Sequence, residues 1–554
     1  MAILKNTTAL IIEPHASTRD SMQAMLNSYN IAKVDAANSS GTGIRQLRNN
    51  TYDIVLCEYD LAEGQTGQDG QQLLDDLRTN KIIPLSTIFM IVTAESDSQK
   101  IIGAAELTPT DYILKPFTAA ALLTRLERAI ARRTIFMPTY KRLEQGRFED
   151  AISSCKLGEE EHPKFATDFL RLRADIHISI GQLDNAALIY QALIESKPLA
   201  WARLGLAKIH FQQDRYAEAE KSLTELLQDN TKYLEAYDYL AKTLEANGNI
   251  EGAKSVLERA VAVSPHGIKR LRKLGQVALE TGDIGTAERA FQQVLSKAKY
   301  SEFRDPEDHF QLVKTLVTKG DTRQAATIIR DLEKSSGGQN AAKVPTCKAF
   351  SDAMVHDSNG NKDLAISALN TAVLACRNSP SVSTDLKMSL AKSCLENKLD
   401  DNASEVMLEV MSNTASPKIL AKAISVFEEA GRSDLAENIS KESKRLVIEL
   451  VSAGAQKAKL GDYRGAVDLM ANAALKFPNN PQVIFNAAVA ALKCLERVGW
   501  DRTLCENARW YIDNARRLDP TNTRLVQLDE LYMTILTKNA INPAQINIKA
   551  PKRS

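Results

Sequence analysis

Short apolar runs alternate with helix-like segments over the first 130 residues of the chain. The apolar runs are Thr8–Ile12, Asp53–Cys57, Thr87–Val92 and Tyr112–Leu114. Between them, apolar residues recur at the period of a helix, around residues 18–29, 41–49, 70–79 and 98–107. Apolar strands that alternate with helices predict a parallel sheet with helices on both faces. A last helix, at about 118–132, is expected to close this domain, with a boundary near residues 134–138.

Each predicted strand is followed or ended by a polar residue. These residues are Glu13, Glu58, Thr93 and Lys115. The carboxyl ends of parallel strands meet at one edge of a sheet, which is where such folds place their binding sites. The pattern therefore predicts a site built from four polar side chains at this edge.

From about residue 136 the helical periodicity continues without any strand signal. An alanine recurs at spacings of 33, 34 and 34 residues from Ala186 to Ala287. Because two helices can cross closely only where a side chain is small, this period predicts stacked helical hairpins. The full series of alanines is Ala151, Ala186, Ala219, Ala253, Ala287, Ala325, Ala365, Ala403, Ala436, Ala466 and Ala508.

We expect residues 1–133 to form the first domain and residues 136–521 to form about eleven hairpins, with a possible break near 300–345 where the spacing widens. A helix within 522–540 is expected to cap the array, and the tail 541–554 is expected to be disordered. Such an array forms a superhelix whose groove binds a peptide or a partner helix.

Composition excludes several classes of function. The chain of 554 residues has 70 basic and 69 acidic residues and a net charge of +1, which argues against nucleic acid as a partner. Its seven cysteines are scattered without a CxxC motif, which indicates reduced, buried thiols and no metal site. No membrane span and no signal peptide are predicted, so we expect a cytoplasmic protein. We also expect no enzyme activity and no cofactor, because no catalytic or nucleotide motif occurs.

The first domain resembles the receiver domain of bacterial response regulators. The resemblance is carried by the stretch that begins Val92-Thr-Ala-Glu-Ser and by Asp111-Tyr-Ile-Leu-Lys-Pro-Phe. It implies a flavodoxin-like, doubly wound α/β fold with five parallel strands. It also implies that Thr93 is the switch hydroxyl, Tyr112 the switch aromatic residue and Lys115 the conserved lysine, joined to Pro116 by a cis peptide.

The resemblance fails at the phosphorylation chemistry. Glu58 stands at the position of the phosphoacceptor aspartate, and Pro14 replaces one carboxylate of the acidic pair that begins with Glu13. Mg²⁺ requires near-octahedral oxygen ligands, so Glu13 and Glu58 predict weak metal binding at most. Asp60, two residues further on, is an alternative acceptor. Two interpretations of Glu58 stay open: it imitates the phosphorylated state, or it forms a fixed ion pair with Lys115.

The helical region resembles an all-α tetratricopeptide superhelix, and the whole chain resembles response regulators of the VieB-type auxiliary group of three-component systems. That resemblance implies an adaptor that binds a sensor histidine kinase or response regulator through residues 15–22 and 115–117, and inhibits phosphotransfer to the cognate regulator. The repeat groove would bind another protein. Two alternatives are a regulator phosphorylated on Asp60 or Glu58, and a repeat scaffold for an envelope or pilus assembly.

Overall fold

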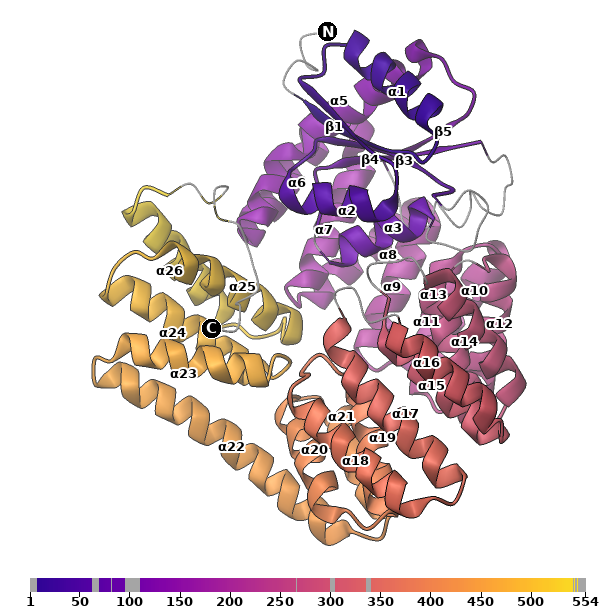
Figure 1. Ribbon diagram of the computed structural model, residues 1–554. Helices are drawn as coiled ribbons and strands as arrows, with labels where there is room; N and C mark the ends of the chain where they lie inside the picture. Colours follow the sequence, from indigo (N-terminus) through magenta and orange to yellow (C-terminus); the bar gives the residue numbers. More distant parts are fainter. Residues whose placement is uncertain are drawn as a thin grey trace.

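The protein has two parts, a sheet domain and a long helical array (Figure 1). The computed structural model describes residues 7–61, 69–80, 82–94, 110–265, 267–298, 304–334, 340–541, 543 and 546. The helix predicted around 98–107 and nearly all of the tail lie outside these residues.

Within the described residues, the first part is a five-stranded parallel sheet with the strand order β2-β1-β3-β4-β5. This is the predicted fold class. The strands are β1 (Thr8–Ile12), β2 (Lys33–Ala37), β3 (Ile54–Glu58), β4 (Ile88–Thr93) and β5 (Asp111–Leu114).

The two faces of the sheet are covered by different helices because successive strand residues point to opposite sides. Ile11 and Leu56 face a core shared with α1 (Ala16–Ser28) and α5 (Ala119–Glu144). Their neighbours in the strands face a second core shared with α2 (Ser40–Asn49) and α3 (Gly70–Thr79). The apolar runs identify β1, β3, β4 and β5 but miss β2. That strand pairs only with β1, at the edge, and Val34, Asp35 and Ala36 are half-buried, so it carries no continuous apolar run.

The predicted end of the last helix of this domain is wrong. Helix α5 does not stop near residue 132; it continues through Pro138 to Glu144. Its first half lies in the sheet domain, where Leu126 is fully buried, and its second half packs in the array, where the ring of Phe136 stacks on Phe169 at 4.1 Å. Because both halves are held by separate cores, one helix belongs to both parts of the protein.

The alanine series identifies the repeat register correctly. Every alanine in it lies in the second helix of a hairpin, and none exposes more than 4% of its surface. Over the described residues, α5 to α25 form eleven hairpins and α26 follows them. The helices after α5 are α6 (Phe148–Glu161), α7 (Ala166–Ser179), α8 (Leu183–Ser196), α9 (Ala200–Gln212), α10 (Tyr216–Asp229), α11 (Leu234–Ala246), α12 (Ile250–Val263), α13 (Ile268–Glu280), α14 (Ile284–Ala298), α15 (Pro306–Lys319), α16 (Thr322–Lys334), α17 (Val344–Ser358), α18 (Lys362–Arg377), α19 (Thr384–Glu396), α20 (Asp400–Ser412), α21 (Pro417–Glu429), α22 (Ser433–Lys459), α23 (Tyr463–Lys476), α24 (Pro481–Arg497), α25 (Arg502–Leu518) and α26 (Leu525–Lys538).

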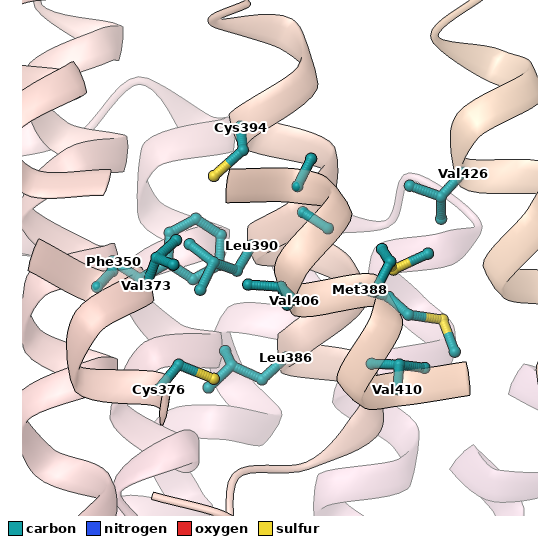
Figure 2. Close-up of a cluster of buried hydrophobic side chains, with 14 of the residues drawn as sticks. Phe350, Val373, Cys376, Leu386, Met388, Leu390, Cys394, Val406, Val410 and Val426 are labelled. Carbon is teal, nitrogen blue, oxygen red and sulfur yellow. The ribbon is translucent and has the colours of Figure 1, made fainter. Parts of the chain in front are cut away.

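Two separate hydrophobic clusters meet within 300–345, the range in which a break is predicted. One cluster joins Phe291 in α14 to Ile329 in α16, and another joins Phe310 in α15 to Phe350 in α17. Figure 2 shows part of the second cluster, with Cys376 and Cys394 among its apolar side chains. Two clusters also meet along α22, a helix of 27 residues that ends one hairpin and begins the next. All seven cysteines are buried and unpaired with one another, as predicted.

The end of the array folds back onto its beginning. Arg509 of α25 donates a hydrogen bond of 3.2 Å to the carbonyl oxygen of Gln145, and the guanidinium of Arg516 lies 4.5 Å from the ring centre of Phe148. Both arginines are more than 90% buried, and both pair with Asp529 in α26. The last helices therefore lie beside α6 in Figure 1. Among the described residues, no helix has an apolar stretch long enough to span a lipid bilayer.

Candidate functional site

The four predicted polar residues do converge at the carboxyl edge of the sheet. In the parallel register, Glu58 lies opposite Val92 and Thr93 lies opposite Leu114, so the ends of three neighbouring strands are level. Glu13 follows β1 on the other side of β3. Glu13 is fully buried, and Glu58 and Thr93 expose only 6% and 4% of their surface. Two carboxylates are thus held largely out of water at one edge of the fold.

Lys115 bridges the two carboxylates. Its Nζ atom lies 2.7 Å from Oε2 of Glu13 and also forms an ion pair with Oε2 of Glu58. The remaining oxygens accept backbone hydrogen bonds: His15 N–H donates to Glu13 at 3.1 Å, and Asp60 N–H donates to Glu58 at 3.1 Å. All four carboxylate oxygens therefore have partners from the chain itself.

Electrostatics keep the lysine charged. Burial disfavours its ammonium, but the hydrogen bonds and charges of Glu13 and Glu58 outweigh burial and raise the pKa of Lys115. Burial raises the pKa of Glu58, and Lys115 offsets part of this effect. A buried carboxylate is tolerated when it is paired and hydrogen-bonded, which describes this cluster.

The pocket does not fit Mg²⁺. A cation held by both carboxylates would have to lie where the Lys115 ammonium already lies. Pro14 offers no side-chain oxygen, and its carbonyl, like that of Glu13, accepts a hydrogen bond from the guanidinium of Arg19, at 3.1 and 2.8 Å. Among the described residues, no group of three or more His, Cys, Asp or Glu side chains is placed to hold a metal ion. The role of Arg19 was not predicted, because nothing in its spacing distinguishes it from a solvated surface arginine.

The remaining predicted positions lie around this cluster. The peptide between Lys115 and Pro116 is cis, as the resemblance implies. Tyr112 points inward, into the core shared with α3, and burial raises the pKa of its hydroxyl. No described residue forms a hydrogen bond with that buried hydroxyl. Asp60, the alternative acceptor, is exposed and lies beyond the end of β3.

One face beside the pocket is open to solvent. His15, Ser17 and Asp20 at the start of α1 are exposed, and so is Pro116 on the neighbouring loop. These are parts of the surface that the resemblance assigns to kinase recognition. The opposite side of the sheet domain, at α3, faces the array instead (Figure 1). The polar cluster therefore borders a surface that another protein can reach.

Comparison with known proteins agrees with the division of the chain into a sheet domain and a helical array. Residues 9–127 match the response regulator receiver domain family, and residues 171–235 and 210–276 match tetratricopeptide repeat families. The chain is 28% identical over 128 residues to chemotaxis protein CheY-3 of Vibrio cholerae, which covers 23% of this chain and 95% of CheY-3. It is 31% identical over 129 residues to transcriptional regulatory protein ZraR of Escherichia coli, over 23% of this chain and 27% of ZraR.

Solved structures give weaker likenesses. A CheY-like receiver domain from Methanospirillum hungatei is 18% identical with a TM-score of 0.21, over 23% of this chain and 97% of that one. A tetratricopeptide repeat protein from Parabacteroides merdae is 14% identical with a TM-score of 0.31, over 49% of this chain and 97% of that one. The family matches and the fold described above define the two parts: a receiver domain and an array of tetratricopeptide repeats. The chain is a signalling protein with protein-interaction repeats.

Proposed function

We propose that this protein is a non-enzymatic auxiliary component of two-component signalling. It binds a sensor histidine kinase or relay partner without being phosphorylated, and it inhibits phosphotransfer to the cognate response regulator. The observation that carries this proposal is the position of the Lys115 ammonium, which bridges Glu13 and Glu58.

Phosphoryl transfer depends on metal electrostatics and on an acceptor oxygen aligned for in-line attack. In this pocket the acceptor position is Glu58, whose two oxygens are engaged by Lys115 and by the backbone of Asp60. The metal position is taken by an ammonium, and Pro14 removes a ligand. These features support a receiver that keeps its fold without its chemistry. They also favour the interpretation of Glu58 as the fixed partner of Lys115.

A receiver without this chemistry still presents its recognition surface. The exposed start of α1, with His15 and Asp20, and the exposed Pro116 remain available for a kinase or relay domain. The repeats add a second contact area on the same chain. Two weak contacts on one chain act intramolecularly once the first has formed, so avidity exceeds either contact by about 10²–10⁴. Full inhibition is therefore expected to need both parts.

The test uses the source cell's sensor histidine kinases, each purified with its cognate response regulator. Autophosphorylation and transfer are followed with the full chain and with an Asp20→Arg variant, which reverses charge on the proposed kinase face. Glu127→Arg, on the exposed surface of α5, is the matched control. The proposal expects one kinase to be inhibited by the full chain and by the control, and clearly less by Asp20→Arg. If no kinase in the set loses autophosphorylation or transfer activity, the proposal is wrong.

A further inference from the structure

The two ends of the array touch where α5 ends and α6 begins (Figure 1). Gln145 caps α5, and its carbonyl oxygen accepts a hydrogen bond of 3.2 Å from the guanidinium of Arg509 in α25. About two turns further along α25, the guanidinium of Arg516 lies 4.5 Å from the ring centre of Phe148, the first residue of α6. We call these four residues the clasp, because they join segments that lie more than 360 positions apart in the chain.

Two glycines let the end of the array approach its beginning. Gly146 follows the cap of α5, and a Cβ there would lie 2.1 Å from a guanidinium nitrogen of Arg509. Gly181 lies in the turn between α7 and α8, and a Cβ there would lie 2.9 Å from the carbonyl oxygen of Pro520, in the loop before α26. The C-terminal helices therefore press against the turns of the first two hairpins, at places where no side chain intervenes.

The C-terminal end of the array has a core of its own. Apolar side chains from the second half of α22 to α26 form one cluster, which includes Val447, Phe477 and Leu536. We call this part the C-terminal unit. Helices α5 to α7 have a separate cluster around Phe136 and Phe169. Among the described residues, no apolar cluster contains side chains from both sides of the clasp. The clasp therefore rests on polar contacts and can break while both cores stay intact.

The clasp arginines also have charged partners within the C-terminal unit. Arg509 pairs with Asp513 at 2.6 Å and with Asp529 at 3.3 Å, and Arg516 pairs with Asp529 as well. Because these carboxylates move with the arginines, opening the clasp leaves neither guanidinium without a counter-charge. What opening removes is a hydrogen bond to a carbonyl and a cation–π contact, both of which are modest compared with an apolar core.

Helix α22 is the place where the C-terminal unit can turn. Its first half contributes Ile439 to the cluster that precedes it, and its second half contributes Val447 to the C-terminal unit. A cavity of about 580 Å³ lies at this junction, between α20, α22 and α23, so the two sides are not close-packed there. The side-chain amide of Asn480 donates to the carbonyl of Ser412 at 2.8 Å and ties the two sides together beside the helix. The junction thus has the form of a hinge.

We propose that the clasp is an autoinhibitory contact: the chain exchanges between a closed ring and an open form in which the C-terminal unit has turned away about α22. In the closed ring, Phe148 and the two arginines cover one another. Aromatic and arginine side chains dominate binding at protein interfaces, so the open form presents a surface that the closed form withholds. The inference goes beyond the proposed kinase inhibition and holds whether or not a kinase is inhibited.

The test measures the distance between spin labels on the two ends by double electron–electron resonance. The labels are placed on Lys156→Cys in α6 and Lys538→Cys in α26, which are exposed positions, while all seven native thiols are buried. Gly181→Ala presses a Cβ against the Pro520 carbonyl and should raise the fraction of long distances by about tenfold, because overpacking a filled contact is unfavourable. Gly282→Ala is the matched control. Gly282 has the same φ of +76° with no atom within 4 Å, so this variant carries the same backbone strain and should keep the distances of the unaltered chain.

A second pair of variants tests the other side of the clasp. Gly146→Ala should displace Arg509 and open the ring, whereas Gly431→Ala, with φ of +70° against +71° and no atom within 4 Å, should not. Hydrogen exchange in α24 to α26 separates opening from unfolding, since the C-terminal unit should stay protected in every variant. The proposal is overturned if Gly181→Ala and Gly146→Ala give the distances of their controls. It is also overturned if long distances appear only together with lost protection in α24 to α26.

Discussion

Replacing Lys115 by methionine tests whether the bridging ammonium holds the receiver pocket together. The substitution leaves the fully buried Glu13 and the 94% buried Glu58 facing each other with only backbone partners. Removing one partner of a buried ion pair costs about 3–5 kcal/mol, because it leaves buried charge uncompensated. In a domain of this size, that loss lowers the melting temperature of the receiver by roughly 10–20 °C at neutral pH.

The matched control is Lys33→Met. Lys33 also pairs with an aspartate of the receiver, Asp35, at 2.8 Å, but its side chain is 52% exposed. An exposed ion pair contributes only about 0–1 kcal/mol, so this variant should melt within a few degrees of the unaltered chain. The melting of both variants is followed by differential scanning calorimetry and by hydrogen exchange of the receiver strands.

The pH dependence of the variant has a defined sign. Burial already raises the pKa of Glu58, and removing Lys115, which opposes that effect, raises it further. A carboxyl group whose folded pKa lies above its unfolded pKa stabilises the fold at low pH and loses that contribution as the pH rises through the folded pKa. The deficit of Lys115→Met should therefore shrink as the pH falls from about 7 to about 5. The reasoning is refuted if Lys115→Met is no less stable than Lys33→Met at pH 7.

Three further substitutions test the account away from the pocket. Asp76 is 9% exposed, and burial, together with the charge of Asp75, raises its pKa to about 7, although the charges of Lys269 and Arg272 oppose this shift. Asp76→Asn should therefore raise the melting temperature at pH 8 more than at pH 5. Equal shifts at both pH values would contradict this reasoning. Gly275→Ala places a Cβ 2.7 Å from the Phe291 ring and should cost about 1–3 kcal/mol in denaturant unfolding. Gly285→Ala meets no atom closer than 3.9 Å and should be neutral or stabilising, so equal losses at both glycines would refute the packing argument.

Patterns of apolar residues predicted the sheet and the repeats because both depend on periodic burial. The alanine series is readable since each hairpin needs a small side chain at the same crossing. The pocket was predictable for a similar reason, as parallel strands must end at one edge. Strand β2 was missed because its half-buried residues at the sheet edge carry no apolar run.

The contacts that the sequence did not reveal depend on tertiary packing. Proline removes a helical hydrogen bond, but packing of Phe136 on α7 and of Thr139 on α6 holds α5 in one piece across Pro138. The bridging position of Lys115 was one of two open interpretations of Glu58. The contact of α3 with α13 joins residues almost 200 positions apart, Asp75 and Lys269, and neither shows any pattern that indicates it.

The central claim is that the receiver keeps its fold but cannot accept a phosphoryl group, and phosphoryl uptake tests it most directly. The purified full chain is incubated with acetyl phosphate and Mg²⁺, and its intact mass is recorded with and without hydroxylamine, which removes acyl phosphates. The paired variant, Pro14→Asp with Glu58→Asp, restores both carboxylate positions and is expected to gain a hydroxylamine-sensitive phosphoryl group. The unaltered chain is expected to gain none. A hydroxylamine-sensitive adduct on the unaltered chain, at Glu58 or at Asp60, would contradict the account.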